Sequence, residues 1–336
     1  MDTPKYLTFT DVAQMTHNGN ILEFAKEFQK ETSLFNTLPW KQASDALHDV
    51  TGVVGDLPEA TWVGLDKGVK ASKGTWKQRE ENLALLESWS ETNEKTYQIA
   101  GNGDALRWQN DRLHIIKMGL EAEEKLIYGN PATDINQPLG FMPRMNVKTD
   151  MYAVASGVKK DFVCLSAGGS TADKESSILL IAKGPMAPHL LYPRHKKFNG
   201  IEFNAFPFEN VKDDEGGNKR VAMSQFIMSF GLSIANHQSV VRIANIDTTS
   251  GGSSSIAAIP DALYEAFASM PREYRSSVQI WTTPKVILAL RKAYAARVQP
   301  ATYPDAIYKN AIGDVLFDNF VIRQCDSMLD TEAVVS

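Results

Sequence analysis

The chain has 336 residues, a net charge of −5 and 43% hydrophobic residues. That apolar content is enough to bury a core, which argues against a disordered chain. The mildly acidic balance disfavours a protein that binds nucleic acid tightly, because phosphate binding needs clustered lysine and arginine.

The cysteines and the first residues indicate the compartment. Cys164 and Cys325 are the only cysteines, too few for a disulfide framework, and we expect both to be reduced. The opening MDTPKYLTF lacks the basic and then apolar pattern of a signal peptide. No apolar run is long enough to span a bilayer. These features predict a soluble protein made in the cytoplasm, with no membrane partner.

Residues 1–40 resemble an arm. One short amphipathic helix is predicted at Ile21–Lys30, and Pro39 prevents a simple helical continuation. The segment is too polar to form a core of its own. We therefore expect it to lie on a neighbouring surface.

Residues 44–80 are rich in glycine and predict a long hairpin. Val50–Val54 and Thr61–Asp66 are interpreted as its two strands, the second because apolar and other side chains alternate along it. An isolated two-stranded hairpin is only marginally stable in water. We therefore expect this hairpin to need a partner surface.

The end of this hairpin is basic, with no acid between Lys67 and Arg79, and glutamates follow directly. These charges have two interpretations. One is a solvated face, and the other is a basic segment that docks on an acidic patch of the next subunit, where charge would set register and association rate. The residues predicted for such an assembly interface are Trp62, Lys67, Lys70, Lys73, Trp76, Lys77, Arg79, Glu80 and Glu81.

A long helix is predicted over 104–128. Asp104 is a suitable N-cap, and the apolar residues at helical spacing include Leu106, Leu113 and Ile127. Gly129 begins the Gly-Asn-Pro stretch that ends it. At ~1.5 Å per residue the helix spans roughly 35 Å, long enough to support a sheet along its length.

The rest of the chain mixes strands and helices, which predicts an α+β fold. The expected strands are Ser177–Ala182, Leu190–Tyr192, Ile201–Phe206, Phe226–Ile234, Val240–Ile246 and Val315–Ile322. Gly251–Ser255 is expected to be a loop, with Pro260 in the first turn of the helix that follows. Thr283 is expected to cap a second helix beginning at Pro284. The tail beyond Asp326 is expected to be loose.

Motifs for chemistry are absent or incomplete. Gly101-Asn102-Gly103 lacks the third glycine of a dinucleotide-binding turn, and no GxxxxGK[ST] phosphate loop occurs. The six histidines do not pair at helical metal-site spacing. Lysines and asparagines of the arm could cross-link subunits, although no catalytic acid is evident. We predict no catalytic, metal or cofactor site, since an enzyme would need convergent titratable groups in a pocket.

Several segments in a fixed order resemble one protein family. They are GGSTADKESSILLIAKGPMAPHLLYP at 168–193, FGLSIANHQSVVRIANID at 230–247, and MPREYR at 270–275. YGNPATDINQPLGFMPRMN at 128–146 belongs to the same pattern. By these segments the chain resembles the major capsid proteins of tailed bacteriophages, especially short-tailed ones.

The resemblance implies a division of the chain into five parts. They are an N-terminal arm (1–40), an extended hairpin loop with a flanking helix (41–100), a peripheral domain with a spine helix (101–150), an axial domain with peripheral-domain strands (151–312), and a C-terminal strand and tail (313–336).

The resemblance also implies a function. A major capsid protein assembles with copies of itself into the pentamers and hexamers of an icosahedral virion shell around double-stranded DNA, without reading its sequence. Portal, scaffolding and decoration proteins are the other expected partners. An encapsulin-like compartment shell protein of the same fold is the alternative, distinguished by protein cargo in place of DNA.

Overall fold

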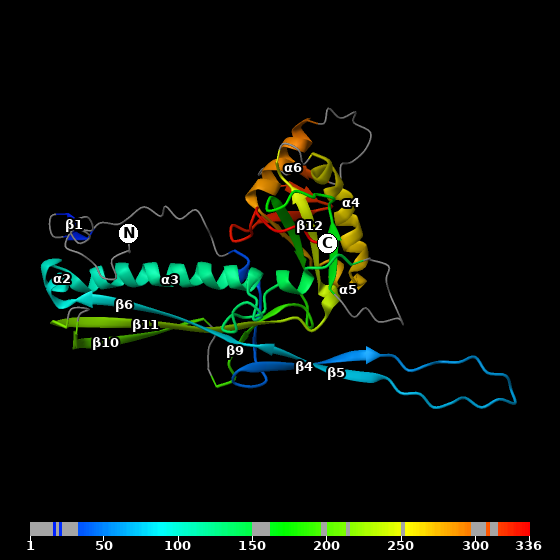
Figure 1. The fold of residues 1–336 in the computed structure, drawn as a ribbon, viewed down its shortest axis with the longest axis horizontal. Coiled ribbons are helices and arrows are strands. Elements are labelled where there is room, and N and C mark those ends of the chain that lie inside the picture. Colours follow the sequence, from blue (N-terminus) through cyan, green and yellow to red (C-terminus); the bar gives the residue numbers. More distant parts are fainter. Residues whose placement is uncertain are drawn as a thin grey trace. The chain divides into compact units, whose positions relative to one another are not determined.

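The computed structural model describes residues 16–17, 20–21, 33–149, 162–195, 200–212, 216–249, 253–296, 307–309 and 315–336. The chain divides into two units. Unit 1 contains residues 1–30, 84–122 and 198–229, and unit 2 contains 31–83, 123–197 and 230–336. Figure 1 labels the elements of both units.

Unit 1 contains three paired strands and most of one long helix. Its described elements are β1 (Thr16–His17), β2 (Asn20–Ile21), β6 (Ala84–Asn93), α2 (Glu94–Ile99), β10 (Ile201–Lys212), and the parts of α3 (Gly103–Tyr128) and β11 (Asn218–Ser233) that belong to it. Strand β11 pairs with β10 in antiparallel register and with β6 on its other side.

Helix α3 covers one face of this sheet. The Ser88 hydroxyl lies 2.8 Å from His114 Nδ1, and Asn110 donates a hydrogen bond to Ser90 Oγ over 2.8 Å. Phe226 of β11 is fully buried and stacks on the His114 ring. Burial lowers the pKa of His114, so the imidazole serves as a neutral packing group.

Arg107 fastens α3 to the irregular centre of the β10–β11 ladder. The register shifts between Ala205 and Phe208, which leaves ladder groups there without regular partners. Arg107 Nη2 donates to the Met223 carbonyl over 2.7 Å and to the Phe206 carbonyl over 3.3 Å. The guanidinium thus replaces ladder bonds that the bulge removes.

Unit 2 is built around a seven-stranded mixed sheet in the order β14-β15-β16-β13-β8-β12-β7. These strands are β7 (Val163–Ser166), β8 (Glu175–Ile181), β12 (Val240–Asp247), β13 (Gln279–Thr282), β14 (Ile307–Lys309), β15 (Val315–Phe317) and β16 (Phe320–Gln324). Every residue of β8 and β12 is buried, as expected of central strands. Helices α4 (Ser253–Ser269) and α6 (Pro284–Ala296) pack against the sheet and close its core.

The other elements of unit 2 lie outside this seven-stranded sheet. They are η1 (Phe35–Thr37), β3 (Trp40–Gln42), β4 (His48–Asp56), β5 (Thr75–Asn82), η2 (Met142–Met145), β9 (His189–Tyr192), η3 (His237–Ser239) and α5 (Arg272–Arg275). Strand β9 pairs in parallel with β3 and in antiparallel register with the last residues of β11. Strands β4 and β5 form a separate hairpin.

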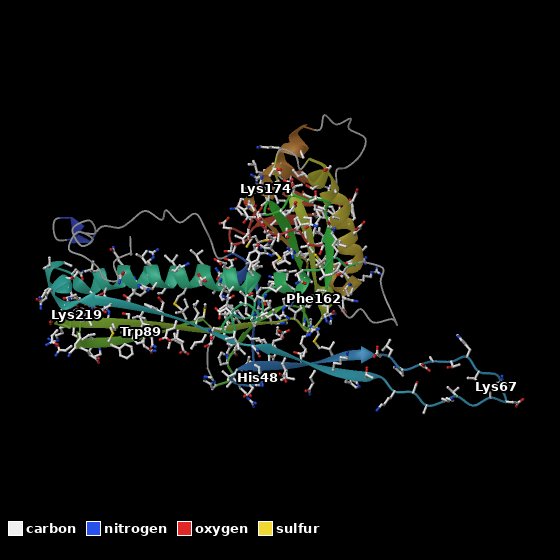
Figure 2. All side chains as sticks on the ribbon, in the orientation of Figure 1. His48, Lys67, Trp89, Phe162, Lys174 and Lys219 are labelled. Atoms are coloured by element: carbon white, nitrogen blue, oxygen red, sulfur yellow. The ribbon has the colours of Figure 1, made fainter. Side chains whose placement is uncertain are left out.

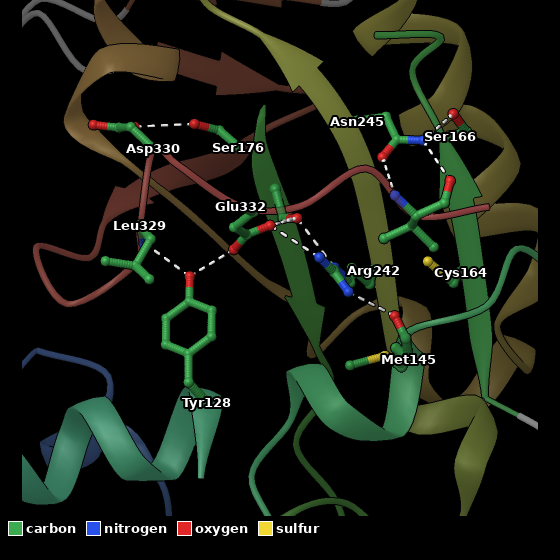
Figure 3. A network of polar contacts seen from close by, with 12 residues as sticks. Tyr128, Met145, Cys164, Ser166, Ser176, Arg242, Asn245, Leu329, Asp330 and Glu332 are labelled. Carbon is green, nitrogen blue, oxygen red and sulfur yellow. Dashed lines mark hydrogen bonds and ion pairs between the residues drawn. The ribbon is translucent and has the colours of Figure 1, made fainter. Parts of the chain in front are cut away.

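A buried polar network joins the sheet of unit 2 to the end of the chain (Figure 3). Arg242 on β12 donates to Glu332 Oε2 over 2.9 Å and to the Met145 carbonyl over 2.7 Å. Ser177 and Tyr128 also donate to the Glu332 carboxylate. Burial, reinforced by that carboxylate, raises the pKa of Tyr128. The phenol therefore stays protonated and can keep donating.

The last residues form part of the fold. Glu332 N donates to the Glu175 carbonyl over 2.9 Å, extending the pairing of β8. Asn245, which has a φ of 58°, exchanges two hydrogen bonds with the Val335 backbone at 2.8 and 2.9 Å. A positive φ is tolerated better by asparagine than by most residues. The expectation of a loose tail beyond Asp326 is therefore wrong.

The buried carboxylate of Glu123, on α3, binds two segments of unit 2 that are far apart in sequence. Glu123 has no exposed surface, and it accepts hydrogen bonds from Leu34 N over 2.8 Å and from Ser327 Oγ over 3.4 Å. Burial raises its pKa, against the opposing effect of these hydrogen bonds. Cys325 also donates to Glu123 through its thiol.

Most predicted elements are confirmed, in particular the helix over 104–128, the buried strands β8 and β12, and the Thr283 cap of α6. The mixed helix and sheet content confirms the α+β class. Helix α3 begins at Gly103, and the Asn102 side chain accepts from Ala105 N over 3.3 Å. The prediction of Asp104 as the cap is therefore wrong, since Asp104 accepts from the Tyr97 hydroxyl.

Two predictions near the C-terminal end are also wrong. Pro260 lies inside α4, not in its first turn, because the helix already begins at Ser253. Ser255, in that first turn, bonds to the Asp247 backbone at 3.1 Å. The single strand over Val315–Ile322 is two strands, β15 and β16. Asp318 and Asn319 have positive φ values and turn the chain back between them.

Some predictions lie outside the described residues. The helix at Ile21–Lys30 is one, except that its first residue belongs to β2. Part of the expected loop at 251–255 is another, although Ser253 onward is helical. Both cysteines are free and buried, and burial raises their pKa values to about 11 for Cys164 and about 12 for Cys325. The expectation of unpaired cysteines is confirmed.

Replacing Glu332 with alanine is expected to lower the free energy of unfolding by about 3–5 kcal/mol, because Arg242 would be left buried without its carboxylate. Urea denaturation of the unassembled protein measures this. Glu265→Ala, on the exposed side of α4, serves as the control and is expected to change stability by less than about 0.5 kcal/mol. Equal effects of the two substitutions would contradict a structural role for the network.

The raised pKa of Glu123 predicts how the stability of the folded protein changes with pH. Because its folded-state pKa is raised, its contribution to stability is complete below its unfolded pKa of about 4.3 and is lost as pH rises through the folded value. Glu123→Gln, which cannot ionise, is expected to gain stability relative to the natural protein as pH rises above about 4.3. Urea titrations across this range measure the difference, and parallel pH profiles for the two proteins would rule the assignment out.

Candidate assembly interface

The β4–β5 hairpin carries a long loop beyond its last paired residues. The antiparallel register runs from His48↔Asn82 to Asp56↔Thr75, and residues 57–74 have no strand structure. We call these residues the projecting loop. Figure 1 shows it continuing from the two arrows, and Figure 2 labels Lys67 at its end.

The prediction of a strand at Thr61–Asp66 is therefore wrong. The partner of β4 is β5, further along the chain. Alternation favours a strand only when one set of side chains can be buried. In the projecting loop both sets are exposed, including Trp62 at 102% and Leu65 at 107% of their reference areas.

The projecting loop exposes an unusual amount of apolar surface. Its large exposed hydrophobic residues are Leu57, Trp62, Val63, Leu65 and Val69. Few internal bonds hold it: Lys67 N donates to the Gly64 carbonyl over 3.1 Å, and Ser72 Oγ to the Glu59 carbonyl over 3.0 Å. Apolar groups gathered on an exposed segment typically mark an interaction site.

The base of the hairpin, in contrast, is firmly anchored by a buried ion pair. Glu81 on β5 is only 3% exposed, and its two oxygens accept from the two Nη atoms of Arg144 at 2.6 Å each. Arg144 also donates to the carbonyls of Leu139, Gly140 and Leu232. A bidentate pair whose guanidinium also donates to three backbone carbonyls has the geometry in which a buried ion pair can offset its desolvation cost.

Arg79 provides a second anchor on the same side of β5. It donates to the Ile234 carbonyl over 2.9 Å and contacts His237 Nε2, and its guanidinium lies 5.8 Å from the centre of the Phe162 ring. Burial lowers the pKa of Arg79, but an arginine remains charged in proteins. The guanidinium thus connects β5 to η3 and to the residue before β7.

Asp49 anchors β4. It is fully buried and accepts from the Ser44 backbone N–H over 3.0 Å, from Lys41 Nζ over 3.2 Å and from Ser233 Oγ over 3.3 Å. Burial alone would raise its pKa, but the hydrogen bonds from Ser44 and Lys41 outweigh it and lower the pKa. A charged Asp49 therefore joins β4 to β3 and to the end of β11.

The structure divides the nine predicted interface residues into two groups. The exposed group is Trp62, Lys67, Lys70, Lys73, Trp76, Lys77 and Glu80. Arg79 and Glu81 instead bind within their own unit. The prediction that these two face a neighbouring subunit is therefore corrected, because alternation along β5 turns them toward the body of unit 2.

The residues missed by sequence reasoning are the partners of these anchors. Arg144, Ser233 and His237 are distant in sequence from the side chains they bind, which are Glu81, Asp49 and Arg79. The period-two pattern of β5 could have separated Arg79 and Glu81 from Glu80. Nothing in the sequence identified Arg144 as the partner of Glu81.

The described residues contain neither a cluster of three metal-ligating side chains nor a membrane-spanning helix. No three histidine, cysteine or acidic side chains gather there into a group suited to a metal ion. None of the described helices has the length and apolar character needed to cross a membrane.

Comparison with known proteins identifies the fold. A bacteriophage epsilon15 structure matches 100% of this chain and 99% of its own, with 18% identity and a TM-score of 0.70. The bacteriophage JBD30 capsid matches at 11% identity over 96% of this chain and 99% of its own, with a TM-score of 0.49. The SrpI encapsulin of Synechococcus elongatus matches at 12% identity over 72% and 96%, with a TM-score of 0.44.

The family follows from a comparison of the sequence. No curated protein matches the chain significantly. A family model described as "Major capsid protein GP7" matches residues 16–336. That range covers nearly the whole chain, and it confirms the resemblance found in the capsid-like segments. The chain therefore belongs to the major capsid protein GP7 family.

Proposed function

We propose that copies of this chain assemble into the pentamers and hexamers of an icosahedral shell that encloses phage double-stranded DNA. The projecting loop is the observation that supports the proposal. The loop is exposed, apolar and basic, whereas the base of its hairpin is anchored by the Glu81–Arg144 pair. Membership of a structural capsid family supports a non-enzymatic role. In such a shell the loop lies across a neighbouring subunit.

The physical argument rests on repetition. A closed shell needs one chain to form rings and to join those rings. Individual contacts can be weak, because several contacts per subunit act together through effective concentration. A loop that crosses a neighbour resists outward pressure from packed DNA, since separating the subunits requires many contacts to break together.

The finer assignments are also proposals. We assign residues 1–40 as an arm that latches onto another subunit, 41–100 as the extended hairpin with its flanking helix, 101–150 as the peripheral domain, 151–312 as mainly the axial domain and 313–336 as the returning strand and tail. Synthesis in the host bacterial cytoplasm and contacts with portal, scaffolding or decoration proteins complete the proposal. The net charge of −5 suits a wall that does not adhere to DNA.

A compartment shell with protein cargo remains the alternative. The match to a capsid family favours a DNA container over it. The contents of purified particles discriminate between the two, because a capsid holds nuclease-protected DNA and a compartment holds a cargo protein.

Deleting the projecting loop is expected to abolish shells without unfolding the subunit. Asp56 and Thr75 face each other at the end of the ladder, so an Asn-Gly pair can replace residues 57–74 as a two-residue turn. The variant is expected to remain a soluble subunit with unchanged cooperative unfolding, because the anchors at Asp49, Arg79 and Glu81 are retained. Electron microscopy measures assembly, and closed shells of normal size would refute the proposed role of the loop.

Reversing the loop charges is expected to slow assembly. Lys67, Lys70 and Lys73 are exposed, and attraction between these lysines and an acidic surface would accelerate association at low salt. The triple change to glutamate should slow assembly and weaken its dependence on salt, as measured by light scattering at several ionic strengths.

The control for this reversal is the same change at Lys148, Lys183 and Lys292, three exposed lysines of unit 2 outside the hairpin. It alters net charge equally. If both triple variants slow assembly to the same extent, then net charge matters and the position of the lysines does not.

A further inference from the structure

Two acidic side chains face each other at one end of the central strands of unit 2. Glu175 and Asp247 are direct partners in the antiparallel pairing of β8 and β12, so their side chains lie on the same face of the sheet. Glu175 is fully buried, and Asp247 is only 6% exposed. Like charges placed directly opposite each other destabilise a sheet. The two carboxylates are therefore a place where a proton or a cation would relieve repulsion.

One oxygen of this pair has no hydrogen-bond partner among the described residues. Glu175 Oε1 accepts from Thr171 N over 2.7 Å, and Asp247 Oδ2 accepts from Thr171 Oγ1 over 2.9 Å. Asp247 Oδ1 accepts from Thr249 N over 2.8 Å. Glu175 Oε2, in contrast, is buried without a hydrogen bond in the described part of the chain. Because a buried polar atom is costly without a partner, this oxygen is suited to binding a ligand.

A second oxygen borders the same small space as Glu175 Oε2. A Cβ atom added to Gly169 would clash with Oε2 and would lie 2.6 Å from the Asn245 carbonyl oxygen. That carbonyl accepts from Gly169 N over 2.8 Å, and a carbonyl oxygen has two lone pairs. Asn245 lies at the register shift between Ile243 and Ile246 of β12. Such irregularities often turn groups of a strand toward a binding site.

The charges around the pair favour binding of a cation. Hydrogen bonds from Thr249 lower the pKa of Asp247, whereas burial, reinforced by the charge of Asp247, raises the pKa of Glu175. Lys174 is close enough to contribute to the lowered pKa of Asp247. Its side chain is nevertheless exposed and forms no ion pair with any described residue (Figure 2). No described lysine or arginine therefore neutralises the two carboxylates directly.

We propose that Glu175, Asp247 and the Asn245 carbonyl bind a calcium ion. These ligands and the Thr171 hydroxyl are all hard oxygen donors, and calcium accepts them in irregular arrangements, whereas magnesium requires a near-ideal octahedron. The site has only two acidic side chains, so it differs from the clusters of three that the described residues lack. With so few charges, the dissociation constant is expected to be on the order of 0.1–1 mM.

Calcium at this position would join three segments of unit 2. Glu175 begins β8, Asp247 ends β12, and residues 168–174 connect to both through Thr171. The Ser255 hydroxyl, in the first turn of α4, bonds to the Asp247 backbone at 3.1 Å. A ligand that binds only the folded state stabilises it by mass action. The proposal concerns unit 2 alone and does not depend on the proposed function of the projecting loop.

Urea denaturation of the unassembled full-length protein tests the proposal. Calcium chloride at about 10 mM is expected to raise the urea midpoint relative to the same buffer with a chelator, and magnesium chloride at equal ionic strength is expected to raise it less. Isothermal titration calorimetry with calcium is expected to find one site per chain. A midpoint and a titration that do not respond to calcium would overturn the proposal and would leave a proton on Glu175 as the compensating charge.

Two site variants locate the effect. Glu175→Gln and Asp247→Asn are expected to lose the calcium-dependent shift of the midpoint. In chelator, Glu175→Gln is expected to be at least as stable as the natural protein, because its repulsion with Asp247 is removed. The matched controls are Asp261→Asn and Glu273→Gln, two exposed acids of unit 2, which are expected to keep the shift. A shift retained in the site variants would place calcium elsewhere and would overturn the proposal.

Hydrogen exchange gives a readout that needs no variant. In the natural protein, calcium is expected to slow backbone exchange over residues 168–175 and to leave residues 78–82 of β5 unchanged. This comparison decides the question if a site variant does not fold. Slowing that is equal in both segments, or absent from residues 168–175, would contradict binding at Glu175.

Discussion

The buried pair of Glu81 and Arg144 is the interaction on which the rest of this account depends. A two-stranded hairpin of this length is marginally stable by itself. The pair joins β5 to η2 (Met142–Met145), and Arg144 also donates a hydrogen bond to the Leu232 carbonyl near the end of β11. Because each charge is buried, loss of either partner would leave the other without compensation. The base of the hairpin is therefore fixed to its own unit.

The contrast between that base and the projecting loop has a physical meaning. Asp49, Arg79 and Glu81 are each satisfied by groups of unit 2. Beyond Asp56 and Thr75 the chain has few bonds and exposes large apolar side chains. Surface of this kind stabilises an assembly when another molecule covers it, by roughly 25 cal/mol for each Å² removed from water. Anchoring the base reduces the ordering cost of that contact.

How far the sequence could predict this structure depended on the range of the interactions. Helix α3 and strands β8 and β12 were predictable, since their apolar residues follow a local period or a continuous run. The exposure of the tryptophan and lysines of the loop was predictable from the glycine-rich, basic composition of that segment, and their place in an interface stays a prediction. The roles of Arg79 and Glu81 were not, because Glu81 and Arg144 are 63 positions apart and neither position alone indicates the other. The polar C-terminal tail looked loose in sequence, but Arg242 and Asn245 bind it from 90 positions away.

Hydrogen exchange over residues 57–74, compared between the unassembled subunit and the closed shell, tests the central claim most directly. The account predicts fast exchange of these backbone amides in the subunit and marked slowing in the shell, while residues 78–82 of β5 are protected in both. Equal exchange of the loop in the two states, or a loop already protected in the lone subunit, would contradict the claim that a second copy supplies its missing contacts.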